Sequence, residues 1–129
     1  MGTRCFFCSF FKFKPLFEGD NILIIEDAHP VSDGHLLIIT KRHVESFFLT
    51  TEEEKIALLK GIEQAKVLIE KKSSPDGYNI GINDGEAAGQ TIKHLHIHLI
   101  PRYKGDSQDP RGGIRWIFPD KAPYWENNE

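Results

Sequence analysis

The chain has little sulfur and no long apolar run. It contains two cysteines and one methionine in 129 residues. No stretch approaches the ~20 consecutive apolar residues of a membrane-spanning helix. The aromatic-rich start lacks a small-residue cleavage site, and Phe6 stands where a myristoylation signal has Ser or Thr. We therefore expect a cytoplasmic protein without a signal peptide, a lipid anchor or a membrane partner.

The chain has no strong excess of positive or negative charge. It contains 16 Lys and Arg residues and 19 Asp and Glu residues, which gives a formal net charge of −3. Proteins that bind nucleic-acid backbones usually have a strong basic excess or a basic stripe, so no nucleic-acid partner is expected. The length favours one domain, residues 1–129, which is large enough to bury a core without disulfide staples.

The two cysteines, Cys5 and Cys8, form a single C-x-x-C. In a reducing compartment such a pair is half of a metal site, a redox pair, or a pair of bystanders. A thioredoxin-like redox motif follows a strand within a βαβ unit, whereas this pair precedes the first predicted strand. A metal site is the favoured interpretation, and the other two stay open.

Short apolar, β-branched runs bounded by turn residues predict four strands. They lie at 21–26, 35–40, 78–83 and 95–101. The second run is apolar on both faces, which indicates a central or covered strand.

One long helix is predicted over residues 50–72. Thr50 and Glu53 form a candidate capping box at its start. Its apolar positions recur at steps of three and four: Ile56, Leu59, Ile62, Ala65 and Ile69. Gly61 costs ~1 kcal/mol relative to Ala within a helix, so close packing is expected there. Antiparallel strands with a helix on one side define an α+β fold class.

The segment 106–129 is rich in proline and glycine, and little regular structure is expected in it. Its aromatic residues indicate that it covers the domain or a partner subunit. Arg111, Arg115 or Lys104 could bind phosphate groups, although a solvated surface position is the more common role. The two tryptophans of the chain could stack on a base, although core or dimer packing is more common.

Three of the six histidines lie in the stretch KHLHIHLIPR, residues 93–102. Because successive side chains of a strand point to opposite faces, His94, His96 and His98 share one face, with neighbours ~6.5–7 Å apart. The intervening aliphatic residues share the other face, which can lie on a core.

Three interpretations compete for this row of imidazoles. The histidines could be solvated or hydrogen-bonded bystanders. They could bind a catalytic metal, as neutral imidazoles do in zinc hydrolases. Alternatively, one of them could be a nucleophile toward phosphorus, since imidazole is mostly neutral at pH 7 and is a good leaving group.

The loop before the histidine strand, NDGEAAGQT at residues 83–91, favours phosphate chemistry. Gly85 and Gly89 allow backbone N–H groups to approach an anion closely, and Gln90 and Thr91 add side-chain donors. A glycine-rich loop alone is weak support, but beside three imidazoles it favours a phosphate over a carbonyl substrate.

HLHIHLI fits the His-φ-His-φ-His-φ-φ pattern of the histidine triad (HIT) family, whose members hydrolyse or transfer nucleotides. NDGEAAGQTIKHLHIHLI resembles the Asn-x-Gly, Gly-Gln-Ser/Thr and histidine block of that family, and EDAHPVSDGHLLIITKRHVESF resembles its nucleotide-binding half. The N-terminal C-x-F-C is common in bacterial-type members. The resemblance covers residues 5–105 and leaves 106–129 as an irregular extension. It implies a HIT-like antiparallel sheet of about five strands, one long helix and a short N-terminal helix.

The resemblance also implies roles for individual residues. His96 resembles the nucleophile that attacks the α-phosphorus and forms a nucleotidyl-imidazole intermediate, with His98 as its catalytic neighbour. Asp27 resembles the carboxylate that accepts from the ribose hydroxyls, although it could be only a turn residue; His35 could likewise be only a buried strand histidine. The implied phosphate and leaving-group ligands are His35, His98, Asn83, Gln90 and Thr91.

In zinc-bearing members of the family, the C-x-x-C joins two histidines in a closed structural site. Here that set is Cys5, Cys8, His43 and His94, and no catalytic metal is required. The resemblance further implies a homodimer and a nucleotide substrate, with a purine favoured. The expected function is cleavage at the α-phosphate of a phosphoanhydride or phosphoramidate. The alternatives are a metal-dependent hydrolase that uses the three-histidine strand as ligands, and a non-catalytic nucleotide-binding module.

Overall fold

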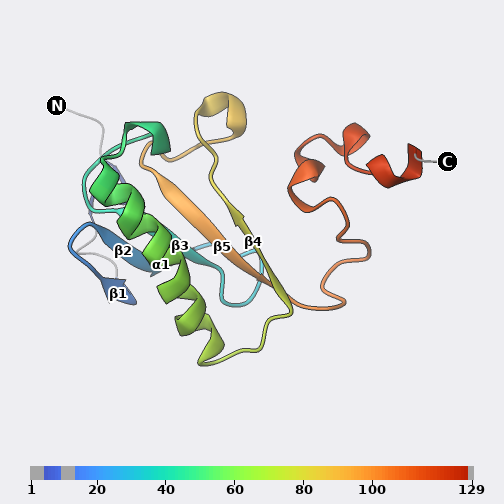
Figure 1. The fold of residues 1–129 in the computed structure, drawn as a ribbon, viewed down its shortest axis with the longest axis horizontal. Helices are drawn as coiled ribbons and strands as arrows, with labels where there is room; N and C mark the ends of the chain where they lie inside the picture. The colour runs from blue at the N-terminus through green and yellow to red at the C-terminus, as the bar shows by residue number, and fades with distance from the viewer. Residues whose placement is uncertain (1–4, 10–13, 128–129) are drawn as a thin grey trace.

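A five-stranded antiparallel sheet carries the histidine strand next to one of its edges (Figure 1). The computed structural model describes residues 5–9 and 14–127. The strand order is β1-β2-β3-β5-β4, and every neighbouring pair is antiparallel. The strands are β1 (Phe17–Glu18), β2 (Ile22–Glu26), β3 (Leu36–Thr40), β4 (Gly77–Gly81) and β5 (His96–Arg102). The α+β class and the five-stranded sheet expected from the sequence are confirmed.

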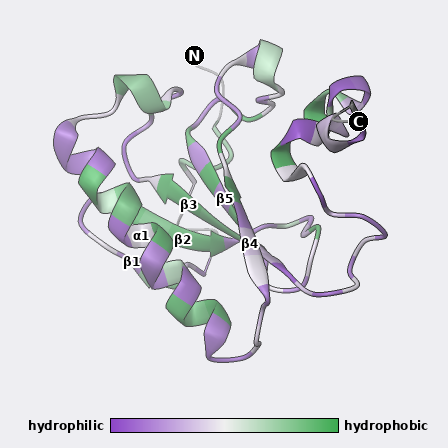
Figure 2. Cartoon of the chain, turned by 45° about the vertical axis from the view of Figure 1, so that its right-hand side comes forward, coloured by the Kyte–Doolittle hydropathy of each residue, from purple (hydrophilic) through white to green (hydrophobic). Residues whose placement is uncertain are grey.

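The two central strands, β2 and β3, are apolar on both faces because both faces of the sheet are covered. In their register Ile24 opposes Ile38, and neither side chain is exposed. Figure 2 shows hydrophobic residues predominating in these two strands, whereas β5 carries hydrophilic residues as well. β3 also pairs with β5, which places Ile39 opposite His96.

Helix α1 (Glu52–Glu70) covers one face of the sheet, mainly over β2 and β3 (Figure 1). Its capping box uses Thr51 and Glu54, one residue later than expected: Glu54 N–H donates to Thr51 Oγ1 at 3.0 Å, and Thr51 N–H donates to Glu54 Oε1 at 2.9 Å. A Cβ on Gly61 would lie 2.9 Å from Ile38 Cγ2, so the helix and the sheet approach closely there.

The buried stripe of α1 differs from the expected one. Ile56 and Leu59 are exposed. The residues that face the sheet are Glu54, Leu58, Gly61, Ala65 and Ile69. Ala65 and Ile69 of the expected stripe are buried, and the close packing expected at Gly61 is confirmed.

The opposite face of the sheet packs against the N-terminal residues. Phe7 is buried among Leu23, Ile25, Leu37 and Ile39. Residues 5–9 form a turn, in which Cys8 N–H donates to the carbonyl of Cys5 at 3.1 Å. A short N-terminal helix was expected in this part of the chain. Residues 1–4 and 10–13 lie outside the described residues, so that prediction is not tested there.

After β5 the chain folds into a C-terminal segment beside β4 (Figures 1 and 2). Two of its arginines pack on aromatic rings of the same segment: the guanidinium carbon of Arg111 lies 4.5 Å from the ring centroid of Trp125, and that of Arg115 lies 4.7 Å from the ring centroid of Tyr124. The 3₁₀ helices of the described chain are Phe47–Leu49, Glu86–Ala88, Gly113–Ile117, Pro119–Lys121 and Tyr124–Asn127.

None of the helices in the described part of the chain combines the length and the apolar character of a membrane span.

Candidate active site

A chain of three polar side chains lies at one end of the histidine row. His35, at the start of β3, is 2.9 Å from His98 of β5, measured from Nε2 to Nδ1. Asp27 follows β2, and its Oδ2 is 3.3 Å from His35 Nε2. The antiparallel pairing of β2, β3 and β5 therefore joins residues 27, 35 and 98 at one place.

Hydrogen bonds indicate where the protons lie. The backbone N–H of Val31 donates to His35 Nδ1 at 3.2 Å. A neutral His35 therefore carries its proton on Nε2 and donates it to His98 Nδ1. The free donor of His98 is then Nε2–H, which is available to a ligand.

Burial keeps both of these histidines neutral in the free protein. Burial lowers the pKa of His35, although the nearby Asp27 carboxylate opposes the shift. Burial, with smaller contributions from His96 and His35, also lowers the pKa of His98. An anionic ligand placed beside His98 would favour its protonated form.

His96 is held by the backbone of its own strand. Its Nδ1 lies 2.8 Å from the carbonyl oxygen of His94. A carbonyl only accepts, so Nδ1 carries the proton and Nε2 keeps a lone pair. The rings of Phe7 and His98 flank His96, with centroids at 5.1 Å and 5.2 Å. A neutral imidazole with a free Nε2 can act as a nucleophile.

The loop between β4 and β5 is tied to the backbone by Gln90. Its Oε1 accepts from Gly85 N–H at 2.8 Å, and its Nε2 donates to the carbonyls of Glu45 and Ile92 at 3.0 Å and 3.1 Å. Gly85 and Gly89 both take a positive φ of 94°. Asn83 and Thr91 are exposed in the same loop. Phosphate binding by these side chains stays a prediction.

A second cluster forms at the other end of the histidine row. Cys5 Sγ lies 3.2 Å from His94 Nδ1, and Cys8 Sγ lies 3.2 Å from His43 Nδ1. The four ligand atoms all lie within 4.8 Å of one another. In a tetrahedral zinc site, bond lengths of ~2.3 Å to sulfur and ~2.0–2.1 Å to nitrogen give sulfur–nitrogen separations of about 3.5 Å. The donor types and their separations therefore fit zinc.

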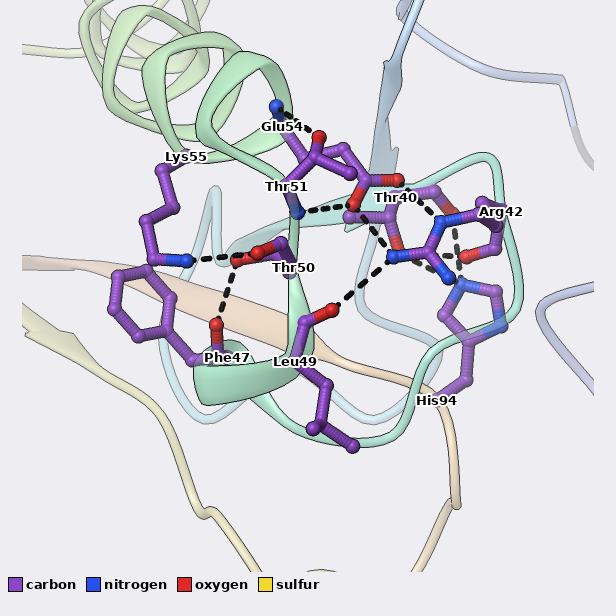
Figure 3. A network of polar contacts seen from close by, with 9 residues as sticks. All are labelled: Thr40, Arg42, Phe47, Leu49, Thr50, Thr51, Glu54, Lys55 and His94. Carbon is purple, nitrogen blue, oxygen red and sulfur yellow. Dashed lines mark hydrogen bonds and ion pairs between the residues drawn. The ribbon is translucent and has the colours of Figure 1, made fainter.

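The imidazole of His94 is oriented for this role by a buried network (Figure 3). Its Nε2 donates to the carbonyl of Thr40 at 2.7 Å, so Nδ1 faces the thiols with its lone pair. Thr40 Oγ1 donates to the carbonyl of Arg42 at 2.9 Å, and Arg42 forms two hydrogen bonds with Glu54 at 2.8 Å and 2.9 Å. The start of α1 is thereby linked to the histidine row.

Without a metal the Cys8 thiol is protonated at neutral pH. Desolvation, together with the neighbouring Cys5, raises the pKa of Cys8 to about 11. A zinc ion deprotonates a thiol that binds it, so zinc binding would release the thiol proton.

The three histidines of the row do not converge on one point. His94 belongs with the cysteines, and His98 belongs with His35 and Asp27. His96 lies between the two groups and bonds to the backbone. This separation opposes the interpretation that the three histidines together bind a catalytic metal.

A family model for the HIT domain matches residues 13–105. The chain belongs to the HIT family. It is 37% identical over 108 residues to the HIT-like protein MJ0866 of Methanocaldococcus jannaschii, covering 81% of this chain and 83% of that one. It is also 37% identical over 106 residues to the adenylylsulfatase HINT3 of Arabidopsis thaliana, covering 79% of this chain and 54% of that one.

A solved structure supports the fold of this HIT protein. The crystal structure of a Zn-bound histidine triad family protein from Mycobacterium smegmatis is similar with a TM-score of 0.73 and 33% identity, covering 81% of this chain and 79% of that one. Family membership supports the expectation of a nucleotide-binding hydrolase or transferase.

Sequence reasoning missed two parts of the site. The N–H of Val31 and the carbonyl of Thr40 orient His35 and His94. Nearly every residue has these backbone groups, so the sequence does not indicate which of them bind a side chain. A cleft of about 840 Å³ also extends from His98 to the C-terminal segment. The aromatic content of that segment was the available signal, but it did not identify what the segment faces.

Proposed function

We propose that this HIT protein cleaves nucleoside phosphoanhydrides or phosphoramidates at the α-phosphate through a covalent nucleotidyl-His96 intermediate. The observation that carries the proposal is the hydrogen bond from His96 Nδ1–H to the carbonyl of His94, which leaves Nε2 free to attack. The similarity to a relative named adenylylsulfatase supports a nucleotidyl substrate.

The first step forms one bond and breaks another. His96 Nε2 attacks the α-phosphorus, and the bond from phosphorus to the oxygen or nitrogen of the leaving group breaks. The anionic phosphate favours a protonated His98, which takes its extra proton from solvent. The Nδ1–H of protonated His98 and the Nε2–H of His35 then both face Asp27, whose Oδ2 lies 3.9 Å and 3.3 Å from those nitrogens. His98 gives its Nε2 proton to the leaving group. In the second step water attacks phosphorus, the bond between phosphorus and His96 breaks, and the water proton returns to His98. The net reaction adds one water across the cleaved bond.

The remaining contacts follow the family resemblance. Asp27 binds the ribose hydroxyls of a nucleotide in which a purine is favoured. The loop side chains Asn83, Gln90 and Thr91 stabilise phosphate charge. The two hydrogen bonds that Gln90 donates to backbone carbonyls suit an additional role, in which it holds the loop in place.

Zinc is proposed as a structural ion. Cys5, Cys8, His43 and His94 would hold it and would fasten the N-terminal turn to β5. These four residues would fill the coordination sphere of zinc, so the ion would stabilise the fold and take no part in the displacement at phosphorus. Its removal should reduce stability more than the intrinsic chemistry. A homodimer and a cytoplasmic location complete the proposal and remain predictions.

The decisive experiment is intact-protein mass spectrometry after a rapid quench without acid. Wild type mixed with a nucleoside phosphoramidate or a dinucleoside polyphosphate should show a transient nucleotidyl adduct. His96→Ala should show none and should lose about 10³-fold or more of the rate. His29→Ala, which changes an exposed histidine of the loop after β2, should behave as wild type.

Zinc is measured on the same samples. One zinc per chain should be retained by His96→Ala and lost by Cys8→Ala. Loss of zinc on changing His96, with no adduct in wild type, would instead support a metal-dependent hydrolase. Nucleotide affinity without turnover in wild type would support a binding module.

A further inference from the structure

The carboxylate of Asp27 has contacts on both of its oxygens. Its Oδ1 accepts from the backbone N–H of His29 at 2.8 Å. Its Oδ2 lies 3.3 Å from His35 Nε2 and 3.9 Å from His98 Nδ1. The role that the family resemblance implies for Asp27, binding of the ribose hydroxyls, does not account for its contacts with these two imidazoles.

We propose that Asp27 is a positioning residue for proton transfer: its Oδ2 accepts the Nδ1 proton of His98 while substrate is bound, which leaves His98 Nε2 to exchange protons with the reacting groups. This inference rests on the proposed function and adds a role for Asp27 beyond any contact with ribose. No bond to Asp27 forms or breaks during the reaction.

The arrangement in the free protein is not the one that the acid form needs. Neutral His98 accepts at Nδ1 from His35 Nε2–H at 2.9 Å. His35 cannot move this proton to its own Nδ1, because that nitrogen accepts from Val31 N–H at 3.2 Å. When His98 gains a proton on Nδ1, two N–H groups therefore face each other, and one of them must find another acceptor.

Asp27 is the acceptor within reach. No other carboxylate of the described chain forms an ion pair with His35 or His98. A charge-assisted hydrogen bond is ~2.7–2.9 Å long, so a movement of about 1 Å joins Oδ2 to His98 Nδ1. The hydrogen bond from His29 N–H holds Oδ1 and leaves Oδ2 directed at the imidazoles. The same carboxylate already opposes the lowering of the pKa of both histidines by burial.

The other groups around His98 do not supply this negative charge. His96, on the same strand, lies 5.2 Å away between ring centroids and lowers the pKa of His98. Gly81 opposes His98 on β4 and has no side chain. The other titratable or charged residues that line the cleft with His35 and His98 are Asp33, Arg102, Tyr103, Asp106 and Asp109. Arg102 pairs with Asp106 at 2.8 Å, and none of the other residues in this set pairs with His98 within the described chain.

The proposed contact serves both steps of the reaction. In the first step protonated His98 gives its Nε2 proton to the leaving group and becomes neutral, with its remaining proton on Nδ1. Asp27 holds that proton, so Nε2 has a lone pair when water attacks the nucleotidyl-His96 bond. His98 Nε2 then takes the water proton, and the Nδ1 proton returns to solvent when the product leaves. Without Asp27, His35 would favour the opposite tautomer, which has no lone pair on Nε2.

Asp27→Asn is the test variant, because it reverses the polarity at one position while it keeps the shape. The amide oxygen can still accept from His29 N–H, which places the amide NH₂ toward the imidazoles. An NH₂ group there can donate to the Nδ1 lone pair of His98 and opposes a proton on that nitrogen. The variant should therefore disfavour the form of His98 that the reaction uses.

The measurement is kcat/KM for two substrates built on one 2′,3′-dideoxynucleoside 5′-phosphate, which has no ribose hydroxyls. One carries an alkylamine on phosphorus, and the amine must gain a proton to leave. The other is a 4-nitrophenyl ester, whose leaving group departs as an anion. Asp27→Asn should lower kcat/KM about 10²-fold for the amine, and less than about fivefold for the ester. The retained ester activity shows that the variant is folded.

A pH profile gives a second measure of the same role. In wild type, kcat for the phosphoramidate should fall at alkaline pH as His98 loses its proton in the substrate complex. Loss of a neighbouring negative charge lowers the pKa of an imidazolium, so Asp27→Asn should move this fall to lower pH by about one unit.

Glu26→Gln is the matched control. It makes the same change from carboxylate to amide one residue earlier, at the exposed end of β2. It should leave both kcat/KM values and the pH profile as in wild type.

Two results would overturn this inference. Equal losses with the two leaving groups would show that Asp27 does not act through proton transfer. A loss with the ribonucleoside phosphoramidate that disappears with its dideoxy form would show that Asp27 acts through the ribose alone. Either result, with a wild-type adduct on His96, would refute only the role of Asp27. Absence of an adduct with every substrate would refute the covalent mechanism and this inference together.

Discussion

The proton positions of the histidine row are set by neighbours that differ at each residue. His94 donates to the carbonyl of Thr40, and His96 donates to the carbonyl of His94. His98 accepts from His35, whose own tautomer is set by the N–H of Val31. Protonation removes the acceptor nitrogens of His35 and His98, so acid should disturb these two contacts.

We expect the free energy of unfolding to fall as pH drops below about 6.5. Burial lowers the pKa of His35, His94 and His98 from an ordinary value of 6.5. Between the folded and the unfolded pKa values the unfolded chain binds more protons, so acid favours unfolding. This contribution is complete above about 6.5 and is lost once pH passes the folded values.

Urea unfolding at pH 7.5, 6.5 and 5.5 measures this effect, with a chelator present so that release of metal does not contribute. His29→Ala should show the same fall, since His29 is exposed. An unfolding free energy that stays constant down to pH 5.5 would contradict the buried neutral histidines.

Sequence reasoning identified the histidine row because strand alternation is a local rule. It also grouped the two cysteines with His43 and His94 through the family resemblance, and these residues do lie together. Proton positions could not be predicted, because they depend on backbone groups that only the folded sheet brings near.

At the scale of elements, α1 is anchored by Glu54. This side chain closes the capping box with Thr51 and forms two hydrogen bonds with Arg42. The sequence TTEEE offered two equivalent registers, since both Thr50 and Thr51 have a glutamate three residues later. The contact with Arg42, twelve residues away, selects the second register, which local reasoning could not decide.

Glu54→Ala should therefore lower the free energy of unfolding by about 1–2 kcal/mol, as expected for a lost cap and hydrogen bonds. Glu53→Ala is the matched control, because Glu53 is an exposed neighbour in the same first turn. It should cost less than about 0.5 kcal/mol. Urea unfolding of both variants measures the difference. Equal losses would show that the capping register does not stabilise the helix.

The strands were predicted to within two residues at each boundary, apart from β1. That strand has only Phe17 and Glu18, too few residues for alternation to be recognised. The buried face of α1 was predicted less well, because exposed Ile56 and Leu59 continue the same apolar period as the residues of the core.

At the scale of the whole molecule, β4 forms an edge of the sheet. It pairs with β5 on one side, and no described strand pairs with its other side. Its Ile80 is exposed. An exposed apolar edge strand is a template for pairing with another chain, which supports the homodimer that the resemblance implies.

Light scattering coupled to size exclusion should give twice the chain mass of 14.7 kDa for wild type. Ile80→Lys should shift the mass toward the monomer, because a charge on an edge strand opposes pairing. Leu16→Lys, beside β1 near the other edge, should leave the mass unchanged. A wild-type mass of one chain at every concentration would rule out the dimer.

The C-terminal segment was the part least open to prediction. Its stacking contacts of arginine on tryptophan and tyrosine have no regular spacing. Its position beside β4 depends on contacts distant in sequence, so composition indicated that it packs but not where.

The two ends of the described chain lie on either side of the reactive histidines. Phe7 packs against His96, and Ile114 and Trp116 line the cleft that begins at His98. The surroundings of the reactive histidines are thus assembled from segments that lie far apart in the chain. A shortened chain that lacks either segment would lose part of those surroundings even if the five-stranded sheet still formed.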